Sequence, residues 1–99
     1  MATRIIEYGG TGLMGPGYAA VPGDAFVTAQ AAMTATGTSA QSAALNNATG
    51  LICVQSDEAI YVLVANNPTA TTDHYRIAAG GEQFWSVKPG AGWKVAIRT

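Results

Sequence analysis

The sequence predicts an all-β fold, a small antiparallel β-sandwich or barrel of the jelly-roll-like kind with an extended glycine-rich N-terminal arm. Short apolar runs follow one another through residues 50–99, and turn-forming residues separate them. Several of these runs alternate apolar and polar side chains with the period of two that a half-buried strand requires. Strands at spacings of about eight to twelve residues are typical of sandwiches and barrels.

At 99 residues the chain has room for one domain. Only 11% of its residues are charged, against about 25% in an average globular domain. Such a surface is either solvated by hydroxyl and amide groups or buried against neighbours, and we favour burial in an assembly. The net charge is −1 and the five Lys and Arg residues are scattered along the chain, so we expect no nucleic-acid partner.

The N-terminal part reads as one short strand followed by an arm. Residues 1–8 contain Ile5 and Ile6 as apolar content, and residues 9–23 hold six Gly and two Pro. We therefore divide the chain into residues 1–23, a strand with a flexible arm, and residues 24–99, the sandwich domain. The N-terminus has no long apolar segment, so we expect no signal peptide, no membrane partner and synthesis in the cytoplasm.

The segment 24–45 is ambiguous because it is rich in Ala, Thr, Ser and Gln. Phe26, Gln30 and Met33 follow helical spacing, whereas alternate residues from Val27 to Met33 share one face of a strand. Propensity hardly decides between the two, since Ala favours helix and Phe, Val and Thr favour strand. We favour two strands.

The pattern is firmer from residue 50 onward. In the run 51–55, Ile52 and Val54 share one face and Leu51 and Cys53 the other. Cys53, the single cysteine, excludes an internal disulfide and reads as a small buried hydrophobe. The next run, 59–65, is apolar on both faces, which predicts a central strand covered on both sides or covered on one side by a partner.

The last three predicted strands alternate as well. In the first and third of them, the expected inward side chains are Tyr75, Ile77, Trp93, Val95 and Ile97, and the expected outward ones are His74, Arg76, Ala78, Lys94, Ala96 and Arg98. In the middle one, Gln83, Trp85 and Val87 share a face opposite Phe84 and Ser86. A Pro-Gly turn lies in the loop before the last strand.

Signals for chemistry are weak. Residues 10–15 match the dinucleotide fingerprint GxGxxG, but no clear helix follows and Gln30 stands where an acidic residue is needed. His74 adjoins Asp73, yet no nucleophile is singled out, so we interpret it as an exposed residue at a strand end. The few acidic residues have no metal-ligand spacing. We expect no enzyme activity, no cofactor and no metal.

Trp85 and Trp93 lie across the last predicted hairpin. They are open to three interpretations: a stacking platform for a sugar, a contact with another subunit, or core packing. Core packing is favoured for Trp93, which shares its face with Val95 and Ile97.

The run from Thr38 to Ile97 resembles a group of small tailed-bacteriophage virion proteins. The matching pieces are the opening TS-x-x-SAAL, a V-x-V strand, NPTATT after a valine-rich strand, and the ending AAG-x-x-x-F-x-V-x-PG-x-x-x-x-VAI. Their order and spacing over about 60 residues carry the likeness, and the glycine-rich N-terminal segment lies outside it.

This resemblance implies a structural protein of the virion, of the capsid decoration or cement type, and no catalytic residues. The expected partner is the major capsid protein, with a homo-oligomer (trimer or dimer) or a lattice-bound form on the capsid surface. The alternative is a head–tail connector or a receptor- or glycan-binding module of a tail or fibre.

We expect contacts through the N-terminal arm and through apolar outer faces of the sandwich. The residues expected at these contacts are Ile5, Ile6, Tyr8, Leu13, Met14, Tyr18, Val21, Tyr61, Leu63, Phe84 and Trp85. Removal of the first 22 residues is expected to abolish capsid binding and to leave a folded domain.

Overall fold

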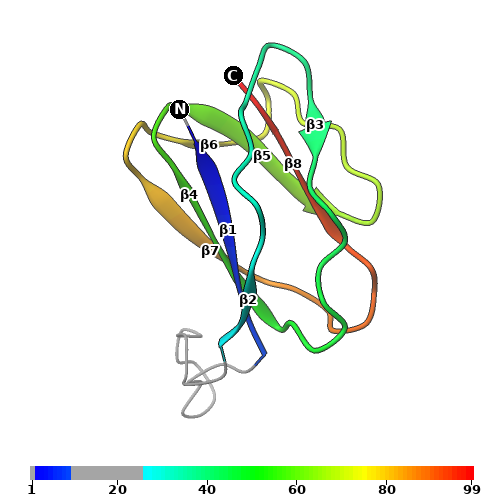
Figure 1. Ribbon diagram of the computed structural model, residues 1–99. Helices are drawn as coiled ribbons and strands as arrows, with labels where there is room; N and C mark the ends of the chain where they lie inside the picture. The colour runs from blue at the N-terminus through cyan, green and yellow to red at the C-terminus, as the bar shows by residue number, and fades with distance from the viewer. Residues whose placement is uncertain (1, 10–25) are drawn as a thin grey trace, which may run out of the picture.

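A computed structural model describes residues 2–9 and 26–99 of the chain, with the backbone alone at Phe26 and Val27. These residues form eight strands in two four-stranded antiparallel sheets and contain no helix (Figure 1). The strands are β1 Thr3–Tyr8, β2 Phe26–Ala29, β3 Ala40–Gln41, β4 Leu51–Ser56, β5 Ile60–Ala65, β6 Tyr75–Ile77, β7 Glu82–Ser86 and β8 Lys94–Arg98. The predicted all-β fold is confirmed, and its two packed sheets make it a sandwich.

Sheet I has the strand order β2-β1-β4-β7, and sheet II has the order β3-β8-β5-β6. β1 is an inner strand of sheet I, where Ile6 pairs with Ala29 of β2 and with Cys53 of β4. The sandwich therefore includes Thr3–Tyr8, which the division at residue 23 grouped with the arm. Removal of the first 22 residues would take away this inner strand.

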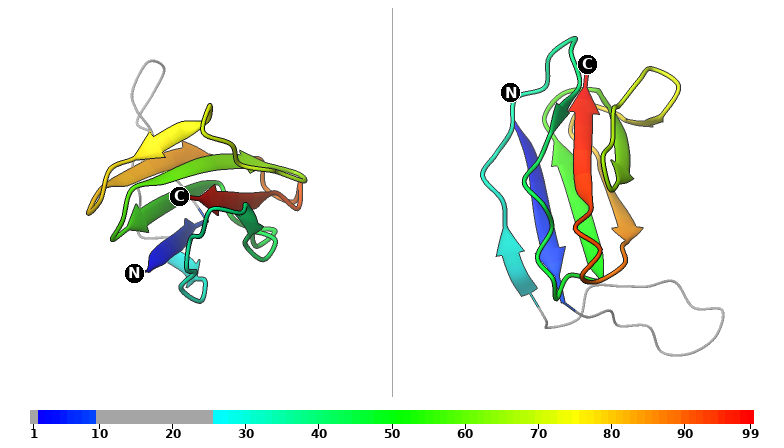
Figure 2. Two further views of the ribbon diagram at one scale, coloured as in Figure 1. Left: turned by 90° about the horizontal axis from the view of Figure 1, so that it is seen from above. Right: turned by 90° about the vertical axis from the view of Figure 1, so that its right-hand side faces the viewer.

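The core lies between the two sheets, which pack face to face (Figure 2). Alternate residues of each inner strand point into it, as the period of two requires. Its fully buried members include Ile5, Ile52 and Val54 from sheet I and Ile60, Val95 and Ile97 from sheet II. Each such side chain stabilises the fold by roughly 1.5–3 kcal/mol relative to an exposed position.

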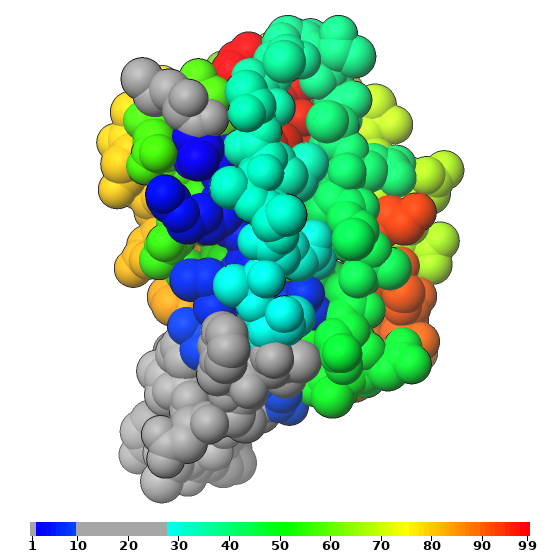
Figure 3. Space-filling model, viewed as in Figure 1, coloured from blue at the N-terminus to red at the C-terminus, as the bar shows by residue number. Residues whose placement is uncertain are grey.

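One long edge of the sandwich is closed by the segment 26–45, which runs along the molecule beside β1 (Figure 3). Its first half bonds to sheet I, where Met33 exchanges backbone hydrogen bonds of 2.8 and 2.9 Å with Thr3. Its second half bonds to sheet II, where Ser42 donates its backbone N–H to Val95 at 2.7 Å. The preferred prediction of two strands here is confirmed by β2 and β3.

The loop 66–74 reaches from the end of β5 to β3, which lies beyond β8 in sheet II. The side-chain amide of Gln41 donates to the side-chain oxygen Oδ1 of Asn67 at 2.9 Å and to the backbone carbonyl oxygen of Pro68 at 2.8 Å. Gln41 is in register with Ala96, which is completely buried rather than solvent-facing as predicted. The apolar outer face of β5 and β8 is therefore covered in part by the chain's own loop.

Tyr75 also departs from its predicted environment. It pairs with Val62 and so lies on the inner face, as expected, but 51% of it is exposed. The reason is its position: β6 has three residues and forms the edge of sheet II, where few neighbours cover it.

Candidate functional site

The predicted contact residues fall on two opposite outer surfaces of the sandwich. Ile6, Tyr8 and Phe84 lie on the outer face of sheet I, because their alternate neighbours point into the core. Tyr61 and Leu63 lie on the outer face of sheet II, opposite in phase to the core residues of β5. The fold thus presents two separate candidate contact faces.

The other predicted contact residues are placed differently. Ile5 is in the core with 1% of its surface exposed, so its side chain packs inside the domain rather than at a contact. Trp85 is half-buried and packs against the core from the inner face of β7. Four of them, Leu13, Met14, Tyr18 and Val21, lie outside the described residues, as does the glycine fingerprint at 10–15.

The outer face of sheet I carries an apolar row made by Ile6, Cys53 and Phe84 in direct register. Cys53, in the middle, is 1% exposed, whereas Phe84 at the edge is 37% exposed. Burial, together with the negative charge and hydrogen bond of Glu82, raises the pKa of the Cys53 thiol to about 11. The predicted buried cysteine is confirmed, and at neutral pH its thiol is protonated.

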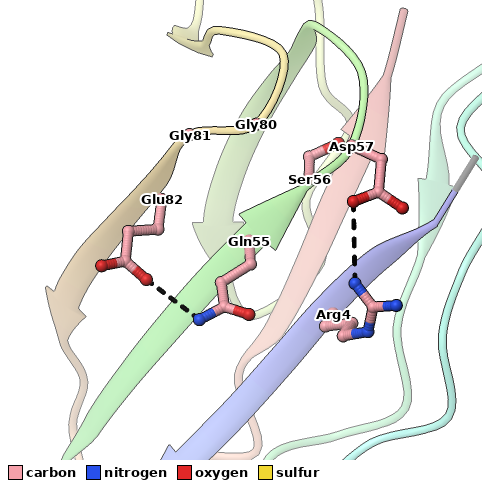
Figure 4. Close-up of a pocket in the computed structure, with 7 residues that line it drawn as sticks. All are labelled: Arg4, Gln55, Ser56, Asp57, Gly80, Gly81 and Glu82. Atoms are coloured by element: carbon pink, nitrogen blue, oxygen red, sulfur yellow. Dashed lines mark hydrogen bonds and ion pairs between the residues drawn. The ribbon is translucent and has the colours of Figure 1, made fainter.

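A hollow of about 380 Å³ lies at the end of this face (Figure 4). Its lining is Arg4, Gln55, Ser56, Asp57, Gly80, Gly81 and Glu82. Gln55 donates to Glu82 at 2.9 Å, and the Arg4 guanidinium lies 3.7 Å from the Asp57 carboxylate. The Ser56 hydroxyl donates to the carbonyl oxygen of Glu58 at 2.7 Å.

These contacts decide what the hollow can do. Its one cation is matched by Asp57, and Glu82 is engaged by both Gln55 and the Cys53 thiol. The Ser56 hydroxyl donates to a main-chain carbonyl, so among the described residues its proton is not held by a general base. The hollow suits hydrogen bonding to a polar group of a partner.

The outer face of sheet II gathers cations around an aromatic ring. Tyr61 is in register with Arg76 of β6 on one side and with Arg98 of β8 on the other. Lys94 lies on the same face, opposite Ala65. Arg76 and Arg98, which are far apart in the sequence, therefore lie on either side of one tyrosine.

His74 closes a turn. Its Nδ1 accepts a hydrogen bond of 2.9 Å from the backbone N–H of Thr71, and the backbone N–H of His74 donates to the Thr71 carbonyl oxygen. The Thr71 hydroxyl also accepts the backbone N–H of Asp73. These hydrogen bonds show that Asp73 and His74 stabilise the turn before β6.

Glu7 is a buried polar residue that the sequence analysis missed. Its Oε1 accepts hydrogen bonds from the Asn46 backbone N–H and the Thr49 hydroxyl, both at 2.7 Å, and its Oε2 accepts from Gln30 at 3.1 Å. The alternation Thr3, Ile5, Glu7 could have placed it inward. Its partners, on the loop before β4 and on the residue after β2, show that it ties these segments to β1.

Within the described part of the chain, no group of three or more His, Cys, Asp or Glu side chains is placed to hold a metal ion. The same residues include no helix long and apolar enough to cross a membrane. Comparisons of the chain with protein-family models, with curated proteins and with solved structures give no match.

Proposed function

We propose that the protein is a bacteriophage capsid decoration protein that binds assembled coat subunits and stabilises the head. The observation that supports this best is the outer face of sheet II, where Tyr61 lies between Arg76 and Arg98 beside the apolar Leu63. Tyr and Arg are enriched at the energetic centres of protein interfaces. The resemblance of residues 38–97 to tailed-phage virion proteins points in the same direction.

The physical mechanism is preferential binding to one state. A copy that contacts two adjacent coat subunits at once binds the closed lattice and not free coat protein. Binding then shifts the assembly equilibrium toward the lattice by mass action, and the gain adds up over many copies. A rigid sandwich suits this role because little conformational entropy is lost when it docks.

The first test is the copy number of the chain in purified virions of a phage whose genome encodes it. Quantitative mass spectrometry would measure its molar ratio to the major coat protein. We expect one copy per coat subunit or a simple fraction of that number. A few copies per particle would support the alternative, a connector or tail component, and absence from the virion would overturn the proposal.

The second test asks which face binds. Tyr61→Ser combined with Arg98→Ser removes an aromatic ring and a cation from sheet II, and we expect at least about tenfold weaker binding to virions that lack the protein. Arg4→Ser is the matched control, since it removes a cation from the outer face of sheet I. Equal loss of binding by both variants would contradict a specific role for sheet II.

A glycan-binding module on a tail or fibre is less well supported. That reading needs an open indole face, but Trp85 packs against the core and meets Tyr75 edge-on, with ring centroids 5.6 Å apart. Its exposed surface is correspondingly reduced.

A further inference from the structure

Two large hydrophobic side chains are exposed in the described part of the chain, and both lie at the same edge of the sandwich. They are Tyr75 on β6, 51% exposed, and Phe84 on β7, 37% exposed. Trp85, the neighbour of Phe84 in β7, contacts the Tyr75 ring at an interplanar angle of 82°. Apolar side chains gathered at one edge indicate an interaction site.

The backbone of β7 is open at this edge. Ser56 donates its N–H to Gly81, and Val87 donates its N–H to Gly50, so odd-numbered residues of this stretch bond to β4. In an antiparallel pair such residues alternate with residues whose N–H and C=O groups point the other way. The backbone groups of Glu82, Phe84 and Ser86 therefore point away from β4, at the free edge of sheet I.

Other edges of the two sheets are protected and β7 is not. β3 has two residues and β6 has three, and the pairing of β2 with β1 is interrupted between Glu7 and Tyr8. The opposite long edge is closed by the segment 26–45. β7 has five residues in regular register and contains neither proline nor lysine, the usual devices that prevent edge pairing.

We propose that β7 pairs with β7 of a second copy of this chain, antiparallel and about a two-fold axis between the two Trp85 residues. In this register Phe84 lies opposite the partner's Ser86, and Glu82 lies opposite the partner's Lys88. One face of this stretch exposes Glu82, Phe84, Ser86 and Lys88. Each copy's Glu82 therefore forms an ion pair with the Lys88 of the other copy, which gives two symmetric pairs.

The same register joins the two sheets I into one eight-stranded sheet. The exposed Tyr75 rings beside Trp85 then gain cover from the second copy. This charge complementarity favours a second copy over a strand of another protein, because one sequence supplies both halves of each ion pair. The inference concerns the isolated protein and does not depend on the capsid proposal.

Charge reversal at the edge tests this directly. Sedimentation equilibrium of the native chain should show a weak dimer whose dissociation constant lies below about 1 mM. The dimer is weak because strand pairing buries less area than a standard interface. Glu82→Lys alone and Lys88→Glu alone should each raise the dimer dissociation constant at least about tenfold. An equimolar mixture of the two single variants should dimerise with about the native affinity, and so should the double variant. Circular dichroism confirms folding of each variant.

Hydrogen exchange supplies an internal control. The amides of Phe84 and Ser86 should become protected as concentration rises, whereas those of Gln83 and Trp85, which face β4, should be protected at every concentration. A protein that stays monomeric near 1 mM would overturn the proposal, as would a dimer that ignores the single reversals. Loss of the dimer without rescue in the mixture would also overturn it, and would favour pairing of β7 with a different protein.

Discussion

The hydroxyl of Thr49 donates a hydrogen bond of 2.7 Å to Oε1 of Glu7, and each residue is only 1% exposed. The loop before β4 is thereby tied to an inner strand of sheet I from inside the protein. A buried acceptor that loses a donor bears the full cost of its desolvation. Loss of this one contact therefore costs more free energy than an average hydrogen bond contributes.

Thr49→Val keeps the shape of the side chain and removes the donor to Glu7. We expect a loss of about 1–3 kcal/mol in the free energy of unfolding, measured by urea denaturation. Thr72→Val, in an exposed turn, is the matched control and should stay within about 0.5 kcal/mol. Equal stability of the two variants would show that Glu7 does not depend on this donor.

The Cys53 thiol should titrate near pH 11, which thiolate absorbance in the ultraviolet would follow. Burial is the main cause of the raised pKa, and Glu82 adds to it through its charge and its hydrogen bond. Glu82→Gln should therefore lower the pKa of Cys53 toward the ordinary thiol value. A midpoint that does not move in this variant would contradict the role of Glu82.

The same titration predicts a dependence of stability on pH. The pKa of Cys53 is raised in the folded state, so its contribution is fully present below the ordinary thiol pKa and is lost as pH rises to about 11. Urea denaturation from neutral to alkaline pH would measure this loss. Cys53→Ala should reduce the fall in the free energy of unfolding between neutral pH and about pH 11. If that fall is the same in the variant, the thiol does not cause it.

Gly81→Ala should destabilise the turn between β6 and β7. A Cβ at residue 81 would lie 2.9 Å from the carbonyl oxygen of Ala78, so backbone must shift, at a cost of about 1–3 kcal/mol. Gly37→Ala is the control, because nothing lies within 4 Å of its added Cβ, and it should be neutral or slightly stabilising. Thermal unfolding would compare the two, and equal midpoints would refute the steric argument.

Trp85 and Tyr75 should show a measurable coupling energy. Their edge-to-face contact joins the edge strands β6 and β7 of the two sheets, and a double-mutant cycle with Trp85→Ala and Tyr75→Ala should give a coupling energy of about 0.5–1.5 kcal/mol. The cycle is best measured in dilute solution, where the dimer proposed above would dissociate. Additive losses from the two single variants would mean that the rings do not stabilise each other.

Much of the second half of the fold could be predicted from local pattern. Ile52 and Val54 face the core together because side chains of a strand alternate, whatever the strand pairs with. The segment 26–45 was ambiguous because Ala fits helix and strand alike, and tertiary pairing with Thr3 and Val95 decided it. Tyr75 was placed on the correct face, but its exposure depends on an edge position that alternation does not report.

The candidate site was less predictable. Tyr61, Leu63 and Phe84 could be assigned to outer faces by alternation alone, but the gathering of Arg76 and Arg98 around Tyr61 required the pairing of three strands. Ala96 is buried on the outer face of sheet II, in register with Gln41 of β3 and Leu63 of β5, where alternation placed it in solvent. Contacts between residues far apart in the chain leave no short-range pattern, so periodicity cannot detect them.

The sequence by itself determined the all-β class and the facing of the strands after residue 50, because both depend on neighbours two positions apart. Tertiary structure alone decided the rest: the inner place of β1, the burial of Glu7 among donors from two other segments, and the cationic face of sheet II. It also decided which strand edge stays open at β7. These features depend on strand order, and strand order is set by the packing of the whole chain around one core.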